Sequence, residues 1–124
     1  MTKLKLLYIH YTGITDPDLD YIKDLTELED LWIMGNDIYD ISALTKLTKL
    51  KSLWLQGDPI TVISVLENMK DLEYLDMTKT NVSDITPLAS LTKLKTLLVD
   101  GSPVKDFSPI KDIYPNLEQK DFEM

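Results

Sequence analysis

The stretch LTELEDLWIMGNDIYDISALTK (25–46) is followed directly by LTKLKSLWLQGDPITVISVLEN (47–68), and both have one pattern of 22 residues. The pattern continues through residues 69–90 and 91–112. Repeat positions 1, 4, 7, 9, 14, 17 and 20 are apolar in all four segments. Such regularity is typical of a solenoid, in which each unit buries its apolar residues against the next.

Weaker copies of the pattern flank these four segments. Residues 1–24 fit with two extra residues near Pro17, and residues 113–124 fit with one extra residue near Pro115. Lys120 stands where the last copy should have a core leucine. We therefore predict a single repeat domain over residues 1–124, with units at 1–24, 25–46, 47–68, 69–90 and 91–112 and a partial unit at 113–124.

Each unit contains a strand signal followed by a helix signal. Repeat positions 7 and 9 are apolar and alternate as in a short strand, and all four glycines follow such a strand, where a turn requires positive φ. The segments 40–44, 84–88 and 106–110 then begin with Asp, a residue that caps helical turns, and two of them contain Pro in the first turn. Stacked units of this kind predict an α/β repeat solenoid with a parallel sheet on one side and short helical turns on the other.

The frame Leu-x-x-Leu-x-x-Leu-x-Leu, followed by Asp-Ile-Thr-Pro-Leu-Ala-Ser-Leu-Thr-Lys-Leu (84–94), resembles the leucine-rich repeat of internalins. It is also similar to the repeat of the leucine-rich regulatory subunit of protein phosphatase 1. The resemblance implies a right-handed superhelix with the sheet on its concave side, and it implies protein binding as the general function. The family usually has Asn at repeat position 12, whereas here that position carries Thr12, Asn36, Asp58, Thr80 and Ser102.

Two columns of charged residues alternate in sign from one unit to the next. Repeat position 5 carries Lys5, Glu29, Lys51, Glu73, Lys95 and Glu118. Repeat position 3 carries Lys3, Glu27, Lys49, Asp71 and Lys93. Counterparts on neighbouring strands lie about 5 Å apart, so each charge lies between two opposite charges. We interpret the columns as a device that fixes the stacking register, with a charged binding edge as the alternative.

Strand positions 6, 8 and 10 point away from the core, because positions 7 and 9 point into it. Both tryptophans, Trp32 and Trp54, occupy position 8 of adjacent strands. A row of aromatic side chains on an exposed sheet is typical of a contact surface, although aromatic residues also favour strands for structural reasons. The candidate partner-binding residues on this face are Tyr8, His10, Trp32, Met34, Trp54, Tyr74, Asp76, Leu98 and Asp100.

The same face becomes acidic toward the C-terminus, where Asp76, Asp100 and Asp121 occupy outward positions. A partner with an apolar patch beside a basic patch would be complementary to it. The whole chain has 13 basic and 21 acidic residues and a net charge of −8, which disfavours binding to nucleic acid. No apolar run is long enough to cross a membrane.

The residues needed for common catalytic and metal sites are missing. The chain has no cysteine, and His10 is its only histidine, so neither a thiolate nucleophile nor a histidine metal cluster can form. Asp16, Asp18 and Asp20 lack the glycine and the distal glutamate of a calcium loop, and we interpret them as a solvated insertion. We predict no enzymatic activity, no metal and no cofactor.

We therefore predict a protein–protein interaction module that binds a protein partner through its concave face. A structural spacer within a larger repeat protein, weak carbohydrate binding through the tryptophans and, least favoured, a hydrolase are the alternatives. Leucines of the first strand also predict end-to-end self-association through the N-terminal end. Internalins begin with a secretion signal and a helical cap, and neither is found here. The default location is therefore cytoplasmic, and a domain excised from a secreted or cell-surface protein would have the same sequence features.

Overall fold

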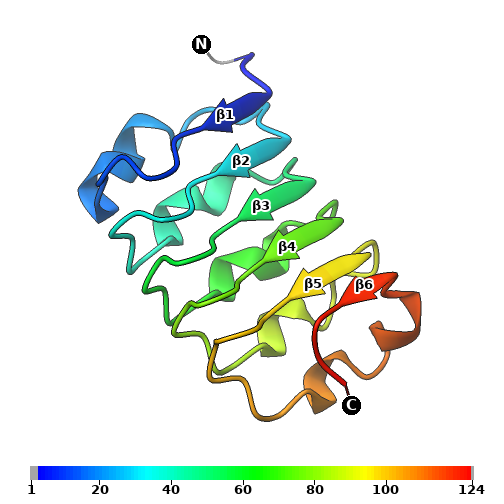
Figure 1. Cartoon of the computed structure of the whole chain (residues 1–124). Helices are drawn as coiled ribbons and strands as arrows, with labels where there is room; N and C mark the ends of the chain where they lie inside the picture. The colour runs from blue at the N-terminus through cyan, green and yellow to red at the C-terminus, as the bar shows by residue number, and fades with distance from the viewer. Residues whose placement is uncertain (1–2, 124) are drawn as a thin grey trace.

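The computed structural model describes residues 3–123, so Met1, Thr2 and Met124 of the first and last predicted units lie outside it. Within that range the chain forms a six-stranded parallel sheet in the order β1-β2-β3-β4-β5-β6 (Figure 1). The strands are β1 (Leu6–Tyr8), β2 (Asp30–Trp32), β3 (Ser52–Trp54), β4 (Tyr74–Asp76), β5 (Thr96–Leu98) and β6 (Gln119–Lys120). Short 3-10 helices connect them on the opposite side, namely η1 (Asp16–Tyr21), η2 (Ser42–Lys46), η3 (Ser64–Asn68), η4 (Thr86–Leu88), η5 (Ser108–Ile110) and η6 (Tyr114–Asn116). The predicted α/β repeat solenoid is confirmed.

Neighbouring strands pair in the register that the leucine frame predicts. One row of paired residues crosses the whole sheet and consists of Leu7, Leu31, Leu53, Leu75, Leu97 and Lys120. The extra residues near Pro17 and Pro115 are taken up in η1 and η6, outside the strands. They therefore leave the strand register undisturbed.

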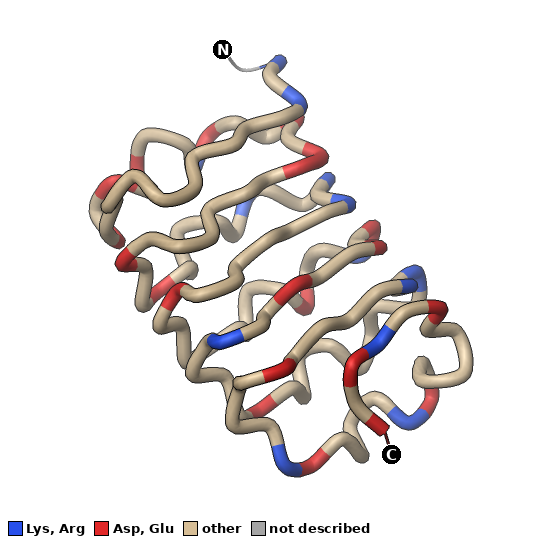
Figure 2. The backbone as a smooth tube through the Cα atoms, in the orientation of Figure 1, with Lys and Arg blue, Asp and Glu red and all other residues tan. Residues whose placement is uncertain are grey.

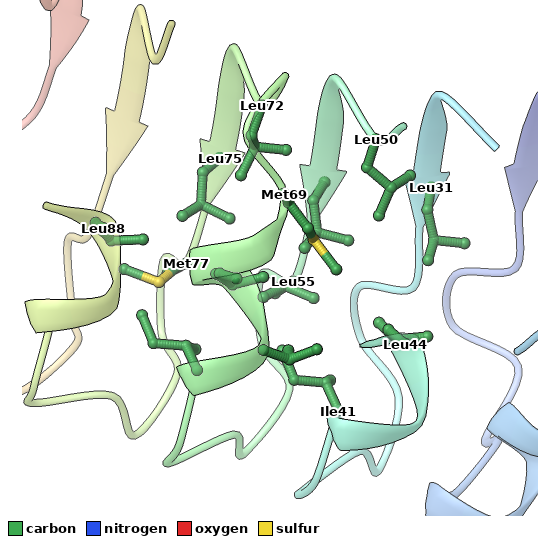
Figure 3. Packing of buried hydrophobic residues seen from close by; sticks show 14 of the residues in the cluster. Leu31, Ile41, Leu44, Leu50, Leu55, Met69, Leu72, Leu75, Met77 and Leu88 are labelled. Carbon is green, nitrogen blue, oxygen red and sulfur yellow. The ribbon is translucent and has the colours of Figure 1, made fainter. Parts of the chain in front are cut away.

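The apolar positions of the repeat form one continuous core between the sheet and the helices. In Figure 3, Leu31, Leu55 and Leu75 project from the sheet side toward Leu44 and Leu88 of the helices. All five of these side chains are fully buried. Each coil thus buries its apolar residues against the next, as expected for a stacked repeat.

The sequence predicts that an aspartate is the N-cap residue of each helical turn. In the structure the aspartate precedes the N-cap residue by one position. The N-cap residue of η2 is Ile41, and the Asp40 carboxylate accepts a hydrogen bond of 2.8 Å from the backbone N–H of Ser42. Asp84 and Asp106 make the same contact with the residue two places further on. The backbone hydrogen bond from Ser42 lowers the pKa of Asp40. The predicted capping is present, as an Asx-type turn.

The residue at repeat position 11, in the turn after each of the first five strands, has positive φ. Repeat position 11 carries Tyr11, Gly35, Gly57, Lys79 and Gly101, with φ of 56°, 72°, 80°, 58° and 77°. All four glycines, including Gly13, have positive φ, so the turn prediction is confirmed. At Gly35 a Cβ atom would also collide with the ring of Tyr11. Glycine is therefore required there for two separate reasons.

The two charged columns lie along the edge where the strands begin, and Figure 2 shows the alternation of basic and acidic residues along it. Four contacts of the predicted kind are formed. They are Lys49–Glu27 at 2.7 Å, Lys93–Asp71 at 2.7 Å, Lys51–Glu29 at 3.4 Å and Lys5–Glu29 at 3.7 Å. Glu29 therefore lies between lysines of both neighbouring coils. This arrangement supports the interpretation that the columns favour one stacking register.

Reversing the sign of Lys51 tests this interpretation. Lys51→Glu should lower the free energy of unfolding by about 0.2–1 kcal/mol at low salt, because it places like charges on three successive coils. Thermal melts at low and high salt measure the effect, which should nearly vanish at about 1 M salt, where charges are screened within about 3 Å. A Lys51→Glu variant as stable as the wild type at low salt would remove the structural role of the columns.

Candidate functional site

Four aromatic rings form a continuous stack across the outward face of the sheet. We call Tyr8, Trp32, Trp54 and Tyr74 the aromatic column. Successive ring centroids are 4.3 Å apart for Tyr8–Trp32, 4.2 Å for Trp32–Trp54 and 4.7 Å for Trp54–Tyr74. Parallel strands lie about 4.8 Å apart, so side chains at equivalent positions repeat close to the stacking distance of aromatic rings. Tyr8, Trp32 and Trp54 stack because they are in register, whereas Tyr74, the register partner of Ser52, joins the column from two residues earlier on its strand.

The two indoles occupy the middle of this column and expose their edges. Trp32 and Trp54 are half-buried, and their planes lie 21° from each other, while the plane of Tyr74 lies 19° from that of Trp54. Neighbouring rings therefore cover both faces of each indole. The edge of an aromatic ring carries partial positive charge, whereas its face is negative. The column presents a ridge of ring edges to an approaching molecule.

Hydrogen bonds between side chains hold the rings in place. The Trp32 Nε1–H donates to Asp30 Oδ1 at 2.8 Å, and the Tyr8 hydroxyl donates to Asp30 Oδ2 at 3.3 Å. The Trp54 Nε1–H donates to Ser52 Oγ at 2.7 Å. Burial and the charge of Asp30 raise the pKa of Tyr8. The indole donors are satisfied before any ligand binds, so the surface is preorganised.

The remaining candidates of the N-terminal half lie beside the column. The His10 ring centroid is 5.9 Å from that of Trp32 and 5.7 Å from that of Tyr11. Met34 is half-buried and follows Trp32 by two residues on the same outward side. Tyr11 was not among the predicted site residues. The structure brings all of these side chains to one end of the aromatic column.

The acidic candidates of the C-terminal half differ from the expectation at Asp76. Asp76 is only 5% exposed, because its partners in the register are the larger residues Trp54 and Leu98. Its Oδ1 accepts the backbone N–H of Thr78 at 2.9 Å. Leu98 is half-buried and Asp100 is exposed, as predicted. Asp76 can therefore act on a partner through its charge, but its side chain is too buried to make much direct contact.

Asp121, the third acidic residue of this half, is engaged by the backbone of the neighbouring coil. Its Oδ1 accepts the N–H of Val99 at 2.8 Å, and its Oδ2 accepts the N–H of Asp100 at 3.0 Å. Its carboxylate thereby bonds the backbone just beyond the end of β5. Asp100 and Asp121 are both exposed at this end of the face.

The outward face of the sheet has no lysine at its strand positions. The chain contains no arginine, and its lysines near the sheet lie mainly in the two charged columns at the edge (Figure 2). The acidic residues at outward strand positions are Asp30, Asp76, Asp100 and Asp121. The field of this face is therefore negative, although the edge beside it is mixed.

Asn36 links the first two coils below the aromatic column. Its Oδ1 accepts the backbone N–H groups of Thr12 and Gly13, each at 2.9 Å. Its Nδ2 donates to the carbonyl oxygens of Ile9 and Ile33, each at 2.8 Å. The single asparagine at repeat position 12 thus satisfies backbone groups of two coils, and it braces the turn that carries Tyr11.

Asp58 occupies the equivalent place in the next coil and is fully buried. Its Oδ1 accepts the backbone N–H of Asn36 at 2.8 Å, whereas its Oδ2 has no hydrogen-bond partner. Burial raises the pKa of Asp58 to about 7. By repeat equivalence, an amide at this position would be placed like that of Asn36, whose Nδ2 donates to the carbonyl oxygens of Ile9 and Ile33, whereas an ionised carboxylate cannot donate. The sequence shows only that Asp58 departs from the asparagine usual at this repeat position, and the unsatisfied oxygen becomes visible in the structure.

The acidic segment of the first coil has a structural role. Asp16 Oδ1 accepts the backbone N–H groups of Tyr39 at 2.7 Å and Asp40 at 3.2 Å, which joins the first coil to the second. Asp18 Oδ2 accepts the N–H of Thr15 at 2.9 Å. Over residues 3–123, no three carboxylate or histidine side chains gather closely enough to hold a metal ion. In the same range, none of the helices has the length and apolar character to cross a membrane.

Comparisons with known proteins agree with this architecture. A family model of leucine-rich repeats in two copies matches residues 48–90. The crystal structure of internalin C2 from Listeria monocytogenes matches with 32% identity and a TM-score of 0.83, covering 93% of this chain and 50% of that chain. None of the curated proteins matches the chain. The fold and the repeats define a leucine-rich repeat protein. Its repeats are of the internalin-like type, and the chain spans half the length of internalin C2.

Two more distant structures share the fold. A leucine-rich repeat protein of Leptospira interrogans is 21% identical with a TM-score of 0.72, covering 83% of this chain and 27% of that chain. The plant peptide hormone receptor RGFR1, solved in complex with RGF2, is 23% identical with a TM-score of 0.68, covering 82% of this chain and 17% of that chain. Leucine-rich repeats commonly serve as protein-interaction modules.

Proposed function

We propose that residues 1–124 form one repeat domain that binds a protein partner through the outward face of the sheet, centred on the aromatic column. The column carries the proposal. Tryptophan and tyrosine supply much of the binding energy at protein interfaces, and here stacking and the bonds to Asp30 and Ser52 fix the rings in advance. A preorganised surface loses little conformational entropy on binding.

The proposed partner carries an apolar patch beside a basic patch. The apolar patch would contact the aromatic column together with His10, Met34 and Leu98, and the basic patch would face Asp100 and the field of the buried Asp76. The lack of lysine on the outward strand positions supports this choice. Opposite charges speed association and exclude wrong partners more than they raise affinity.

The alternatives fit the geometry less well. A sugar ring stacks on the face of an aromatic side chain, and both indole faces are covered by neighbouring rings. A spacer role would leave the half-exposed column without a use beyond its own stacking energy. We propose no catalytic activity, because the aromatic column supplies neither an activated nucleophile nor a general base.

Affinity capture with three immobilised proteins tests this function. The baits are the wild type, Trp54→Ala and Tyr21→Ala. Tyr21 lies on η1, outside the sheet, and is 85% exposed, so it is a matched aromatic control. We expect a partner that wild type and Tyr21→Ala retain and that Trp54→Ala loses. A partner retained equally by all three would contradict binding through the column.

We also propose self-association through the N-terminal end, supported by the exposure of β1. Leu6 is 54% exposed, and Leu7 and Ile9 are only partly buried, whereas the equivalent Leu31 and Ile33 are fully buried. β1 is an edge strand of the sheet. An edge strand offers free backbone groups to another strand, and a two-fold arrangement would pair β1 with β1 of a second copy.

Sedimentation equilibrium over a range of protein concentrations measures this association. The wild type should dimerise as its concentration rises, and Leu6→Lys should remain monomeric because it places a charge in the contact. Ser52→Lys is the matched control, because Ser52 occupies the same repeat position on the central strand β3. A monomeric wild type at millimolar concentration would contradict the proposal.

A further inference from the structure

A separate groove lies at the edge where the strands end, away from the aromatic column. We propose that it is a docking site for an apolar side chain on a basic protein segment. The groove, which we call the Val62 groove, has a volume of about 400 Å³ and is lined by Tyr39, Asp40, Ser42, Thr61 and Val62. It lies outside the outward face of the sheet, so it is independent of the function proposed above.

Val62 stands where other coils place a capping aspartate. Asp40, Asp84 and Asp106 each accept the backbone N–H of the residue two places on. A valine cannot accept that bond, so the first residue of η3, Ser64, has no such partner. Val62 is also 64% exposed. The chain thus exposes an apolar side chain at a position where an aspartate would stabilise the helical turn. Residues that forgo local stability in this way are expected at functional sites.

Tyr39 provides the second apolar wall of the groove. Its side chain is 61% exposed, and its backbone N–H is held by Asp16 Oδ1 at 2.7 Å. A β-bridge between Asp40 and Val62 fixes the neighbouring coils against each other. Tyr39 and Val62 are therefore held in place on adjacent coils before any ligand arrives. An aliphatic side chain of a partner would fit between them.

The charges around the groove indicate the rest of the partner. Segments 10–22, 33–44 and 55–66, which follow β1, β2 and β3, contain no lysine and six aspartates, and Figure 2 shows this acidic edge. Of the six, Asp58 is fully buried and Asp20 lies 3.9 Å from Lys23. Among the described residues, neither Asp16 nor Asp40 forms an ion pair with a lysine. The hydrogen bond from the Ser42 backbone keeps the pKa of Asp40 low, so it is charged at neutral pH. Lysine or arginine beside the apolar anchor would be complementary.

The corresponding edge of the later coils differs from the Val62 groove in both charge and capping. Segments 77–88 and 99–110 carry Lys79 and Lys105, and both have the capping aspartate in place. Within the described coils, an exposed apolar groove wall and segments that carry aspartate without lysine therefore coincide only around β2 and β3. This coincidence selects a basic segment over an acidic one.

NMR titration with three capped tripeptide amides tests the Val62 groove. The probes are Lys-Leu-Lys, Lys-Ser-Lys and Glu-Leu-Glu. Lys-Leu-Lys should shift the backbone amide signals of Tyr39 and Val62 saturably, with at least fivefold higher affinity than the other two. In Val62→Asp its affinity should fall at least fivefold. An equal response to Lys-Ser-Lys, or shifts confined to the two indole signals of the aromatic column, would overturn the proposal.

The melting temperatures of two variants with opposite substitutions provide a second, independent test. Val62→Asp should raise the melting temperature by about 2–6 °C, because it restores the missing cap. Asp84→Val, at the same repeat position two coils further, should lower it by a similar amount. A lower melting temperature for Val62→Asp would show that Val62 is retained for packing, and this result would also overturn the proposal.

Discussion

Replacing Asp58 with asparagine should stabilise the protein by about 1–3 kcal/mol at neutral pH or above. Asp58 is fully buried, and its Oδ2 has no partner. An amide in its place can donate to the carbonyl oxygens of Ile33 and Leu55, as Asn36 Nδ2 does to Ile9 and Ile33 in the preceding coil. Urea unfolding measured at several pH values gives the free energies.

The gain should depend on pH in a defined direction. Burial raises the pKa of Asp58 from its ordinary 3.8 to about 7 in the folded protein. Between these values the folded state binds more protons than the unfolded state, so the contribution of Asp58 to stability is fully present below pH 4 and falls as the pH rises toward 7. Asp58→Asn removes this slope. Its advantage should therefore be small at pH 4 and reach its full size above pH 7.

The capping aspartates create the opposite trend at lower pH. Hydrogen bonds that the residues two places further on donate to the carboxylates lower the pKa of Asp40, Asp84 and Asp106. Their contribution is present above about pH 4 and is lost as the pH falls further. The wild type should thus be most stable in mildly acidic solution. Asp58→Asn should retain the acid loss and move the optimum toward neutral pH.

Asn36→Asp is the matched control for this prediction. It removes an amide donor from the same repeat position and should lower the free energy of unfolding by about 1–3 kcal/mol at neutral pH. Opposite signs for the two exchanges would establish that this position requires a donor. An Asp58→Asn variant that is less stable than the wild type at pH 7.5 would show that the buried carboxylate is satisfied in solution.

Replacing Trp54 with alanine should weaken partner binding at least 30-fold, equivalent to about 2 kcal/mol, the threshold of an interface hot spot. Trp54 lies in the middle of the aromatic column and contacts the rings of Trp32 and Tyr74 at 4.2 Å and 4.7 Å. Its removal deletes a contact residue and also removes the stacking partner that fixes the rings of Trp32 and Tyr74. Calorimetric titration of the captured partner measures the loss, and Tyr21→Ala should change affinity less than twofold.

The same substitution should also lower the free energy of unfolding by about 1–3 kcal/mol, because two aromatic contacts and half-buried area are lost. Trp54→Phe separates the two effects. A phenyl ring maintains the stack, so stability should be nearly retained while the indole edge is missing from the contact surface. An affinity unchanged by both variants would place the binding site elsewhere.

The sequence predicts the fold well because the decisive signal is the spacing of leucines along the chain. Leu31, Leu53, Leu75 and Leu97 recur at a constant spacing, and the same residues align across the sheet. The outward direction of Trp32 and Trp54 follows from strand alternation alone. The glycine turns and the capping aspartates are local signals of the same kind, and both are present in the structure.

The remaining features depend on contacts between coils that spacing does not encode. Trp54 and Tyr74 occupy different repeat positions, yet their rings stack because the side chains lean toward each other. Asp76 is buried because both of its register partners are larger. The unsatisfied oxygen of Asp58 becomes visible only when its coil is compared with that of Asn36.

The two indole N–H signals of a ¹H–¹⁵N NMR spectrum provide the most direct test of the proposed binding surface. Both tryptophans of the chain belong to the aromatic column, so these two signals report on it alone. Adding the partner captured by the wild type should shift or broaden both signals in proportion to saturation, while amides of the exposed η1 remain unchanged. Saturating binding that leaves both indole signals in place would contradict recognition through this face.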